Sequence, residues 1–461
     1  MLFSSITFLY LFLPVLIVYY VVPKNWRNHV LLVASVFFYF VGEPVYVLLL
    51  VVSSLSDFFH SLYIEKHRGE KRAKTALISS VVINLAMLGF FKYTDFFIGV
   101  VNGLLGTQIP LLNVPLPIGI SFFTFQTMSY TIDVYRGRAK CERNFFTLAT
   151  FVCLFPQLVA GPIVRYTDIA KELSDREHKM EDVAQGVRRF VVGLGKKVLI
   201  ANAMGELCAV FRGYPEKSVI FYWIYAIAYT LQIYFDFSGY SDMAIGLGRI
   251  FGFRFPENFN YPYISRSITE FWRRWHMTMG GWFRDYVYIP LGGNRVSSGR
   301  WFFNIFVVWF LTGFWHGADW TFIAWGLLYG VLLVIEKLFL LKHLEKSKVL
   351  SRIYVLLFVV IGFVIFNADG IKGAFADIGG MFGAGGLPFI SGQTLYYLKS
   401  YGLLILAAIL GSMPLLKKLY AKIEDKRIMT ILEPAALCAV MIVVTAYLVD
   451  GSFNPFLYFR F

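Results

Sequence analysis

Two histidines, His276 and His316, are the residues of this chain whose type and setting most directly suggest chemistry. They lie forty positions apart, and each follows a tryptophan within apolar sequence. An ionisable side chain is costly to place at membrane depth, so it is found there mainly where it has a function. A water-poor site favours the neutral form of histidine, which can take a proton from a hydroxyl group. The pair therefore suggests general-base catalysis of acyl transfer to an alcohol. The alternative is a buried histidine whose hydrogen bonds are satisfied by backbone carbonyls.

Motifs for several other kinds of chemistry are missing. The chain has no Gly-x-Ser-x-Gly nucleophile elbow and no His-Glu-x-x-His motif, and its seven histidines lack the spacing of zinc ligands. Its four cysteines form no Cys-x-x-Cys pair, so we expect neither a metal site nor a disulfide framework. The His-x4-Asp motif of glycerolipid acyltransferases is also absent. Asp236 and Asp242 are six positions apart, so on one helix they would point in different directions and would not form a paired-carboxylate site.

The composition indicates a membrane protein. Of the 461 residues, 57% are hydrophobic and only 16% are charged, whereas a soluble domain carries about 25% charged residues. We expect an all-α polytopic membrane protein, with one integral-membrane domain over residues 1–461, because no change in composition marks a soluble domain. The net charge of +14 is explained by basic cytoplasmic loops that meet anionic lipid. The bilayer is therefore an expected partner and nucleic acid is not.

Apolar runs predict the membrane helices, and prolines and glycines predict their breaks. The runs expected to be helical cover residues 4–22, 30–40, 46–63, 75–91, 191–211, 219–234, 302–314, 320–335, 354–366, 395–410 and 434–449. Prolines interrupt the apolar segments 107–130 and 155–166, and broken backbone at membrane depth must be covered by protein or line a water-filled cavity. We expect these two segments to be re-entrant or half-buried. Residues 167–189 are expected to form an amphipathic surface helix, and the glycine-rich residues 369–392 an external loop.

Basic residues near the ends of these runs predict the orientation. Lysine and arginine resist translocation, so the basic stretches 24–27, 65–74, 337–352 and 417–427 are expected in the cytoplasm. The N-terminus and the C-terminus are then both outside. No basic residue precedes the first apolar run, so we expect a retained helix there and not a signal peptide.

Long stretches of the chain resemble the membrane-bound O-acyltransferase family, and within it the alginate and peptidoglycan O-acetyltransferase branch. The matching stretches are PIGISFFTFQTMSYTIDVYRG, QLVAGPIVRY, YFDFSGYSDMAIGLG, PENFNYPY, SRSITEFWRRWHMTMGGWFRDYVYIPLGGNR and LTGFWHGADWTFIAWG, together with the opening MLFSSITFLYLFLP and the closing NPFLYFRF. The resemblance covers nearly the whole chain. It implies that His316, in the FWHG motif, is catalytic and that His276, in the RRWH motif, is the second histidine of the site. It also implies a ring of about a dozen helices with re-entrant segments around a central tunnel.

Further residues within these stretches are candidates for lining the substrate tunnel. They are Trp275, Trp315, Asp236, Tyr240, Arg273 and Asp285. Six tryptophans would supply an apolar wall with polar edges, unless they belong to an interfacial aromatic belt. These are Trp272, Trp275, Trp282, Trp315, Trp320 and Trp325.

The resemblance implies a bacterial cytoplasmic (inner) membrane enzyme that moves an acyl group, and we expect acetyl, from a cytoplasmic thioester to an extracytoplasmic polysaccharide or to a partner transferase. No bound cofactor is expected. The donor would be acetyl-CoA or an acyl-carrier thioester, and the partner an SGNH-type extracytoplasmic acetyltransferase. D-alanyl transfer to teichoic acid stays open, because that neighbouring branch shares both histidine motifs. A transporter or flippase is the competing class, which the lack of an internal repeat disfavours.

Overall fold

Helices are the only regular secondary structure in the part of the chain that the structure describes. The computed structural model describes residues 3–450, 453–455 and 457, and within them there are helices and no strand. Six helical stretches of this part are long and apolar enough to cross a membrane: Val47–Lys66, Lys71–Leu105, Trp320–Leu344, Lys348–Phe366, Gly392–Gly411 and Met429–Val449. This confirms the expectation of an all-α polytopic membrane protein.

The chain divides into two compact units. Unit 1 comprises Met1–Phe190 and Ser241–Pro256, and unit 2 comprises Val191–Tyr240 and Glu257–Phe461. The single domain expected over residues 1–461 is not tested by this division and stays a prediction.

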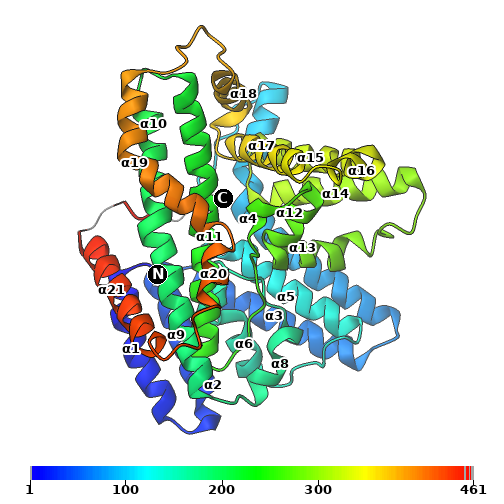
Figure 1. Cartoon of the computed structure of the whole chain (residues 1–461). Coiled ribbons are helices and arrows are strands. Elements are labelled where there is room, and N and C mark those ends of the chain that lie inside the picture. The colour runs from blue at the N-terminus through cyan, green and yellow to red at the C-terminus, as the bar shows by residue number, and fades with distance from the viewer. Residues whose placement is uncertain (1–2, 451–452, 456, 458–461) are drawn as a thin grey trace. The chain divides into compact units, whose positions relative to one another are not determined.

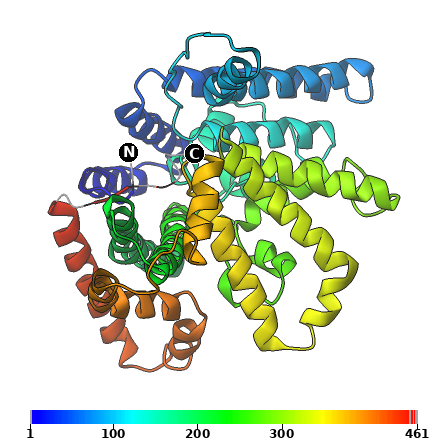
Figure 2. The same cartoon turned by 90° about the horizontal axis from the view of Figure 1, so that it is seen from above.

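Unit 1 is built on the N-terminal helices, coloured blue to cyan in Figures 1 and 2. Its elements are α1 (Ile6–Val21), η1 (Lys24–Trp26), α2 (Arg27–Gly42), α3 (Val47–Lys66), α4 (Lys71–Leu105), α5 (Ile120–Tyr135), α6 (Phe145–Cys153), α7 (Phe155–Leu158), α8 (Tyr166–Ser174) and the first part of α9 (Met180–Gly195). Helices α3, α4 and α5 pack against one another. At their interface the buried carboxylate of Asp57 accepts hydrogen bonds from Ser80 Oγ at 2.6 Å and Asn84 Nδ2 at 2.9 Å. These bonds fasten α3 to α4.

Helices α1, α2 and α3 begin and end close to the boundaries predicted at 4–22, 30–40 and 46–63, but α4 does not. Helix α4 was expected over residues 75–91 but runs over Lys71–Leu105. Polar residues such as Lys92 and Asp95 end the apolar run without ending the helix. The helix stops at Gly106, whose φ of 66° is a left-handed conformation that glycine adopts at little cost.

The two segments interrupted by prolines differ from each other. Residues 155–164 are almost all buried, with α7 followed by irregular backbone, as expected for a broken segment covered by protein. In the other segment, residues 106–113 are exposed, and burial begins only near Pro117. The expectation of a covered segment was therefore wrong for the first part of 107–130 and right for α5, which begins at Ile120.

The single surface helix expected over residues 167–189 was wrong. The structure has α8 and α9 with a break at residues 175–179. His178 fixes this break, because its Nε2 lies 2.9 Å from the hydroxyl of Tyr19 and its Nδ1 lies 2.9 Å from an Arg27 guanidinium nitrogen. The guanidinium can only donate, so Nδ1 accepts and Nε2–H donates. These contacts tie the break to α1 and α2.

Unit 2 holds the remaining helices, coloured green to red in Figure 1. They are η2 (Lys196–Ala201), α10 (Asn202–Gly213), α11 (Val219–Ile250, which continues into unit 1), η3 (Pro262–Ile264), α12 (Ile268–Arg274), α13 (Met277–Phe283), η4 (Arg284–Tyr288), α14 (Ser298–His316), α15 (Trp320–Ile335), η5 (Glu336–Leu340), α16 (Leu341–Leu344), α17 (Lys348–Phe366), α18 (Gly370–Met381), α19 (Gly392–Gly411), α20 (Leu415–Tyr420) and α21 (Met429–Val449). Helix α15 packs against both α14 and α17 (Figure 2).

The glycine-rich stretch expected to be a loop contains a helix, α18, so that prediction was wrong in its first half. Ala374 and Met381 are buried, and the indole N–H of Trp223 donates to the carbonyl oxygen of Met381 at 2.8 Å. A Cβ added at Gly380 would lie 2.4 Å from the ring of Tyr222. Here glycine allows a helix to pack closely, and does not mark a loop.

The predicted orientation can be tested by labelling single cysteines from outside. In a Cys438→Ser background, which removes the exposed native cysteine, we expect Lys74→Cys and Lys418→Cys to stay unlabelled in intact cells and Ala384→Cys to react. Labelling of all three after permeabilisation is the control for reactivity. External labelling of Lys74→Cys as strong as that of Ala384→Cys would contradict the positive-inside assignment.

Candidate functional site

The site in unit 2 rests on an unusually close contact between α14 and α15. A Cβ added at Gly313 would lie 2.3 Å from the carbonyl oxygen of Phe322, and one at Gly326 would lie 2.3 Å from the carbonyl oxygen of Trp309. Only glycine permits such an approach of two helix backbones. The turn between the helices is short, and Asp319 caps α15 by accepting a hydrogen bond from the backbone N–H of Thr321 at 2.8 Å.

His316 is the last residue of α14 and lies in an aromatic environment. Its side chain is buried, and its ring lies 5.0 Å from the rings of Trp315 and Trp325 and 5.4 Å from that of Phe366, centroid to centroid. All three contacts are edge-to-face. Gly317 caps the end of the helix, and a Cβ there would overlap the ring of Phe322 at 2.1 Å. Gly313 and Gly317 therefore permit close approach of the chain at this break.

His276 precedes α13 and is fully buried. Its φ of 44° is a left-handed conformation, which is uncommon for a residue with a side chain. Its Nδ1 lies 3.0 Å from Oδ1 of Asn258, which also accepts from the hydroxyl of Thr278 at 2.9 Å. Because the amide oxygen can only accept, Nδ1 carries the hydrogen and Nε2 carries the lone pair. Asn258 thus sets the tautomer in which Nε2 can act as a base.

Trp315 contacts both histidines. Its ring lies 6.2 Å from that of His276 and 5.0 Å from that of His316. The sequence motifs FWHG and RRWH, forty residues apart, therefore meet at one tryptophan. This is the juxtaposition on which a shared site depends.

A cavity of about 750 Å³ adjoins His276. His276, Trp275 and Arg273 line it, as do Trp309 and Thr312 on the last turns of α14 before His316. His316 itself is not among the lining residues. The remaining lining residues are Thr269, Trp272, Met277, Met279, Gly280, Gly281, Phe283, Arg284, Tyr288, Asn294, Trp301, Ile305, Val308, Leu333 and Lys337.

The cavity has a basic lining. Arg273, Arg284 and Lys337 contribute cations, and none of the described residues that line the cavity is acidic. The carboxylate of Asp285 accepts hydrogen bonds from the Arg284 side chain at 2.8 and 3.2 Å, which raises the pKa of that guanidinium. This pairing offsets the charge of Arg284, so Arg273 and Lys337 are the cations that make the cavity electrostatically suited to an anionic molecule.

Next to His316 lies a buried cluster of aromatic hydrogen-bond donors. The rings of Trp272, Trp325 and Tyr329 lie 4.9 to 5.5 Å apart. Within the described part of the chain, neither of the two indole N–H groups nor the Tyr329 hydroxyl has a hydrogen-bond partner. Buried donors of this kind are costly unless a ligand or water meets them.

Three of the predicted tunnel residues, Asp236, Tyr240 and Asp285, do not line this cavity, and their role in a substrate path stays a prediction. Asp236 is buried in an ion pair with Lys197, with N–O distance 2.6 Å, and accepts a hydrogen bond from the backbone N–H of Leu457 at 2.9 Å. Tyr240 is buried on the same helix, α11, and Asp285 binds Arg284 without lining the cavity. None of these three contributes to the cavity. Trp320, expected in the aromatic wall, is 52% exposed.

Several residues of the site had not been singled out from the sequence. Asn258 lies within the PENFNYPY stretch, but nothing in that pattern pairs it with His276. Glu336 directly follows the apolar run 320–335. It accepts hydrogen bonds from the backbone N–H groups of Ile268 and Thr269, at 2.5 and 3.0 Å, and so holds the start of α12. A buried charge at the end of an apolar run was the available signal.

Replacing His276 with alanine is expected to lower turnover while the protein remains folded, if the histidine contacts substrate or positions a partner in the site. Asn258→Ala should give a partial loss of turnover, since without Asn258 Oδ1 the ring hydrogen of His276 is no longer held on Nδ1. Turnover per folded molecule is measured beside the melting temperature in detergent. A lowered melting temperature with near-normal turnover would show that His276 is structural.

Comparison with known proteins identifies relatives over most of the chain. The profile of the "MBOAT, membrane-bound O-acyltransferase family" matches residues 142–372. A probable alginate O-acetylase of Pseudomonas aeruginosa is 43% identical over 392 residues, which cover 84% of this chain and 75% of that protein. A peptidoglycan O-acetyltransferase of Helicobacter pylori is 36% identical, covering 84% and 81%. A teichoic acid D-alanyltransferase of Bacillus subtilis is 29% identical over 54% of this chain and 68% of its own length.

Proposed function

The chain belongs to the membrane-bound O-acyltransferase family, and from this premise we propose that it transfers an acetyl group from a cytoplasmic thioester to a hydroxyl group of an extracytoplasmic polysaccharide or of a partner transferase. The observation that carries the proposal is the meeting of His276 and His316 at Trp315, beside a cavity with a basic lining. A neutral histidine in such a site can act on a hydroxyl, and the cations suit an anionic donor.

In the proposed reaction His316 is the general base. It takes the proton of the acceptor hydroxyl as the oxygen attacks the thioester carbonyl carbon. The carbon–sulfur bond then breaks, and the leaving thiolate takes the proton back from the imidazolium. The buried donors of Trp272, Trp325 and Tyr329 are suited to the negative charge that develops on the carbonyl oxygen. His276, held by Asn258, would position the acceptor or Trp315.

The donor in this proposal is acetyl-CoA or an acyl-carrier thioester. Both are anionic, through the phosphates of CoA or the acidic surface of a carrier protein, and both suit Arg273 and Lys337. The acceptor partner would be an SGNH-type acetyltransferase outside the cytoplasmic membrane, with the N-terminus of this chain on the same outer side. No resident cofactor is required by the chemistry.

The test is an acyl-transfer assay with the whole protein in liposomes. Donors labelled in the acetyl or D-alanyl group are supplied on one side and polysaccharide or the partner on the other. The proposal predicts acetyl label on oxygen of the acceptor. Label transferred only from the D-alanyl donor would support the neighbouring branch, and movement of an unmodified solute would support a transporter.

A further inference from the structure

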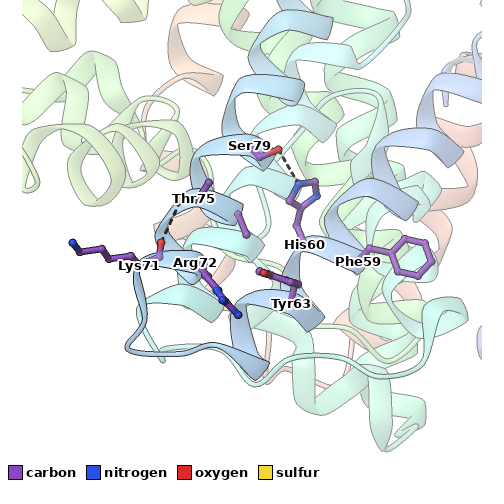
Figure 3. A pocket seen from close by; sticks show the side chains of 8 residues that line it. Phe59, His60, Tyr63, Lys71, Arg72, Thr75 and Ser79 are labelled. Atoms are coloured by element: carbon purple, nitrogen blue, oxygen red, sulfur yellow. Dashed lines mark hydrogen bonds between the residues drawn. The ribbon is translucent and has the colours of Figure 1, made fainter.

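A second cavity, far in sequence from His276 and His316, lies between α3 and α4 in unit 1. It measures about 500 Å³ and is lined by Phe59, His60, Tyr63, Lys71, Arg72, Thr75, Ala76 and Ser79 (Figure 3). All eight residues come from the ends of the two helices that flank the short turn at residues 67–70. We propose that this groove binds an anionic glycerophospholipid, with the lipid phosphate against Lys71 and Arg72.

The charge of the groove favours an anion. Lys71 and Arg72 are exposed, and neither has an ion-pair partner among the described residues. No acidic residue lines the groove. A guanidinium and an ammonium group side by side match a phosphate diester, which accepts hydrogen bonds from both.

The rest of the lining favours a lipid over a small inorganic anion in solution. Phe59 and Tyr63, which are 62% and 44% exposed, form an apolar and aromatic edge on α3. Val52 on α3 and Ile78 and Val82 on α4 continue the exposed apolar surface into the candidate spans. A phosphate ion would make no use of this surface, whereas the acyl chains of a lipid would cover it.

The polar groups at the back of the groove lie at a depth suited to the lipid glycerol. His60 Nδ1 lies 2.7 Å from the carbonyl oxygen of Ser56, so Nδ1 donates, and Nε2 accepts from the Ser79 hydroxyl at 3.2 Å (Figure 3). Ser79 is eight residues along α4 from Lys71, or about 12 Å at 1.5 Å per residue. A phosphate near Lys71 would therefore place the glycerol esters and the first acyl carbons of one lipid molecule along the groove towards Ser79.

The groove is held in shape from behind. Ser80 on α4 donates a 2.6 Å hydrogen bond to Asp57 on α3, and this bond links the two helices close to the lining residues. Asn84 adds a second bond to the same carboxylate. A lipid would thus meet a preformed site, which costs less on binding than a site that must be ordered.

The test measures lipid retention by the whole purified protein with native mass spectrometry. We expect phosphatidylglycerol to be retained at least fivefold more than phosphatidylcholine of the same chain length. Lys71→Gln/Arg72→Gln should remove this preference, whereas Lys66→Gln/Lys74→Gln, two exposed charges of the same region that do not line the groove, should keep it. Equal retention by the two double variants would overturn the proposal.

Two further experiments distinguish a lipid site from a site for a soluble anion. Inorganic phosphate at millimolar concentration should not displace phosphatidylglycerol, and Phe59→Ser should lower retention of the lipid although it leaves both cations in place. Displacement by phosphate together with an unchanged Phe59→Ser variant would show a simple anion site and contradict the lipid assignment. All substituted side chains are exposed, so each variant is expected to fold, which the melting temperature checks.

Discussion

His316→Ala should lower the acyl-transfer rate by about 10²–10⁴-fold, the usual contribution of a general base, while the protein remains folded. The histidine ends α14, and its ring packs edge-to-face against the rings of Trp315, Trp325 and Phe366. Removing the imidazole leaves the close α14–α15 contact at Gly313 and Gly326 unchanged. The rate per folded molecule is measured with labelled donor in liposomes.

A matched control comes from His343, an exposed histidine of the same unit. His343→Ala should keep both the rate and the melting temperature of the original protein. If His316→Ala instead lost folded protein and kept its rate per folded molecule, the ring contacts of His316 would be its main role, and a base would have to be sought elsewhere.

Lys197→Met should prevent most of the protein from folding. Lys197 and Asp236 are each 2% exposed and form an ion pair, and the ammonium also donates to the carbonyl oxygen of Pro455. Removal of one partner leaves a buried carboxylate without its cation, which costs about 3–5 kcal/mol. Whole proteins are stable by only about 5–15 kcal/mol. The yield of monodisperse protein and its melting temperature measure the effect.

The double variant Lys197→Met/Asp236→Leu separates a structural pair from a catalytic one. Removing both charges should restore much of the folded protein, because well-packed apolar residues can replace a buried pair. Lys399→Met, at an exposed position of α19, serves as the control and should have no effect. A Lys197→Met protein that folds normally yet lacks activity would instead support Asp236 as a residue of the substrate path.

The sequence predicted the helices well where apolar runs were long, and less well where other forces decided. The start of α4 at Lys71 and its end at Gly106 lie outside the apolar run, because a charged residue can extend a helix beyond the membrane core. The helix α18 was missed since glycine is read as a loop former, although at Gly380 it makes room for Tyr222.

The sequence singled out the two histidines of the candidate site but not the residues that hold them in place. The two histidines could be found because a titratable group in apolar sequence is unusual. The other features depend on contacts between segments that are distant in sequence. These are the packing of both histidines against Trp315, the hydrogen bond between His276 and Asn258, and the hydrogen bonds from the start of α12 to Glu336. A single sequence contains no signal for such pairs. The ion pair of Asp236 with Lys197 is a further contact of this kind, and the role of Asp236 in the substrate path stays a prediction.

The most direct test of the account is the acetyl-transfer rate of His316→Gln. Glutamine fills much of the space of the imidazole and keeps a hydrogen-bond donor beside Trp325, so packing is preserved better than in the alanine variant, but it cannot take up and return a proton. We expect this variant to fold, to melt near the original temperature and to be nearly inactive. A rate within about threefold of the original, which corresponds to only about 0.7 kcal/mol of activation free energy, would contradict the assignment of His316 as the base.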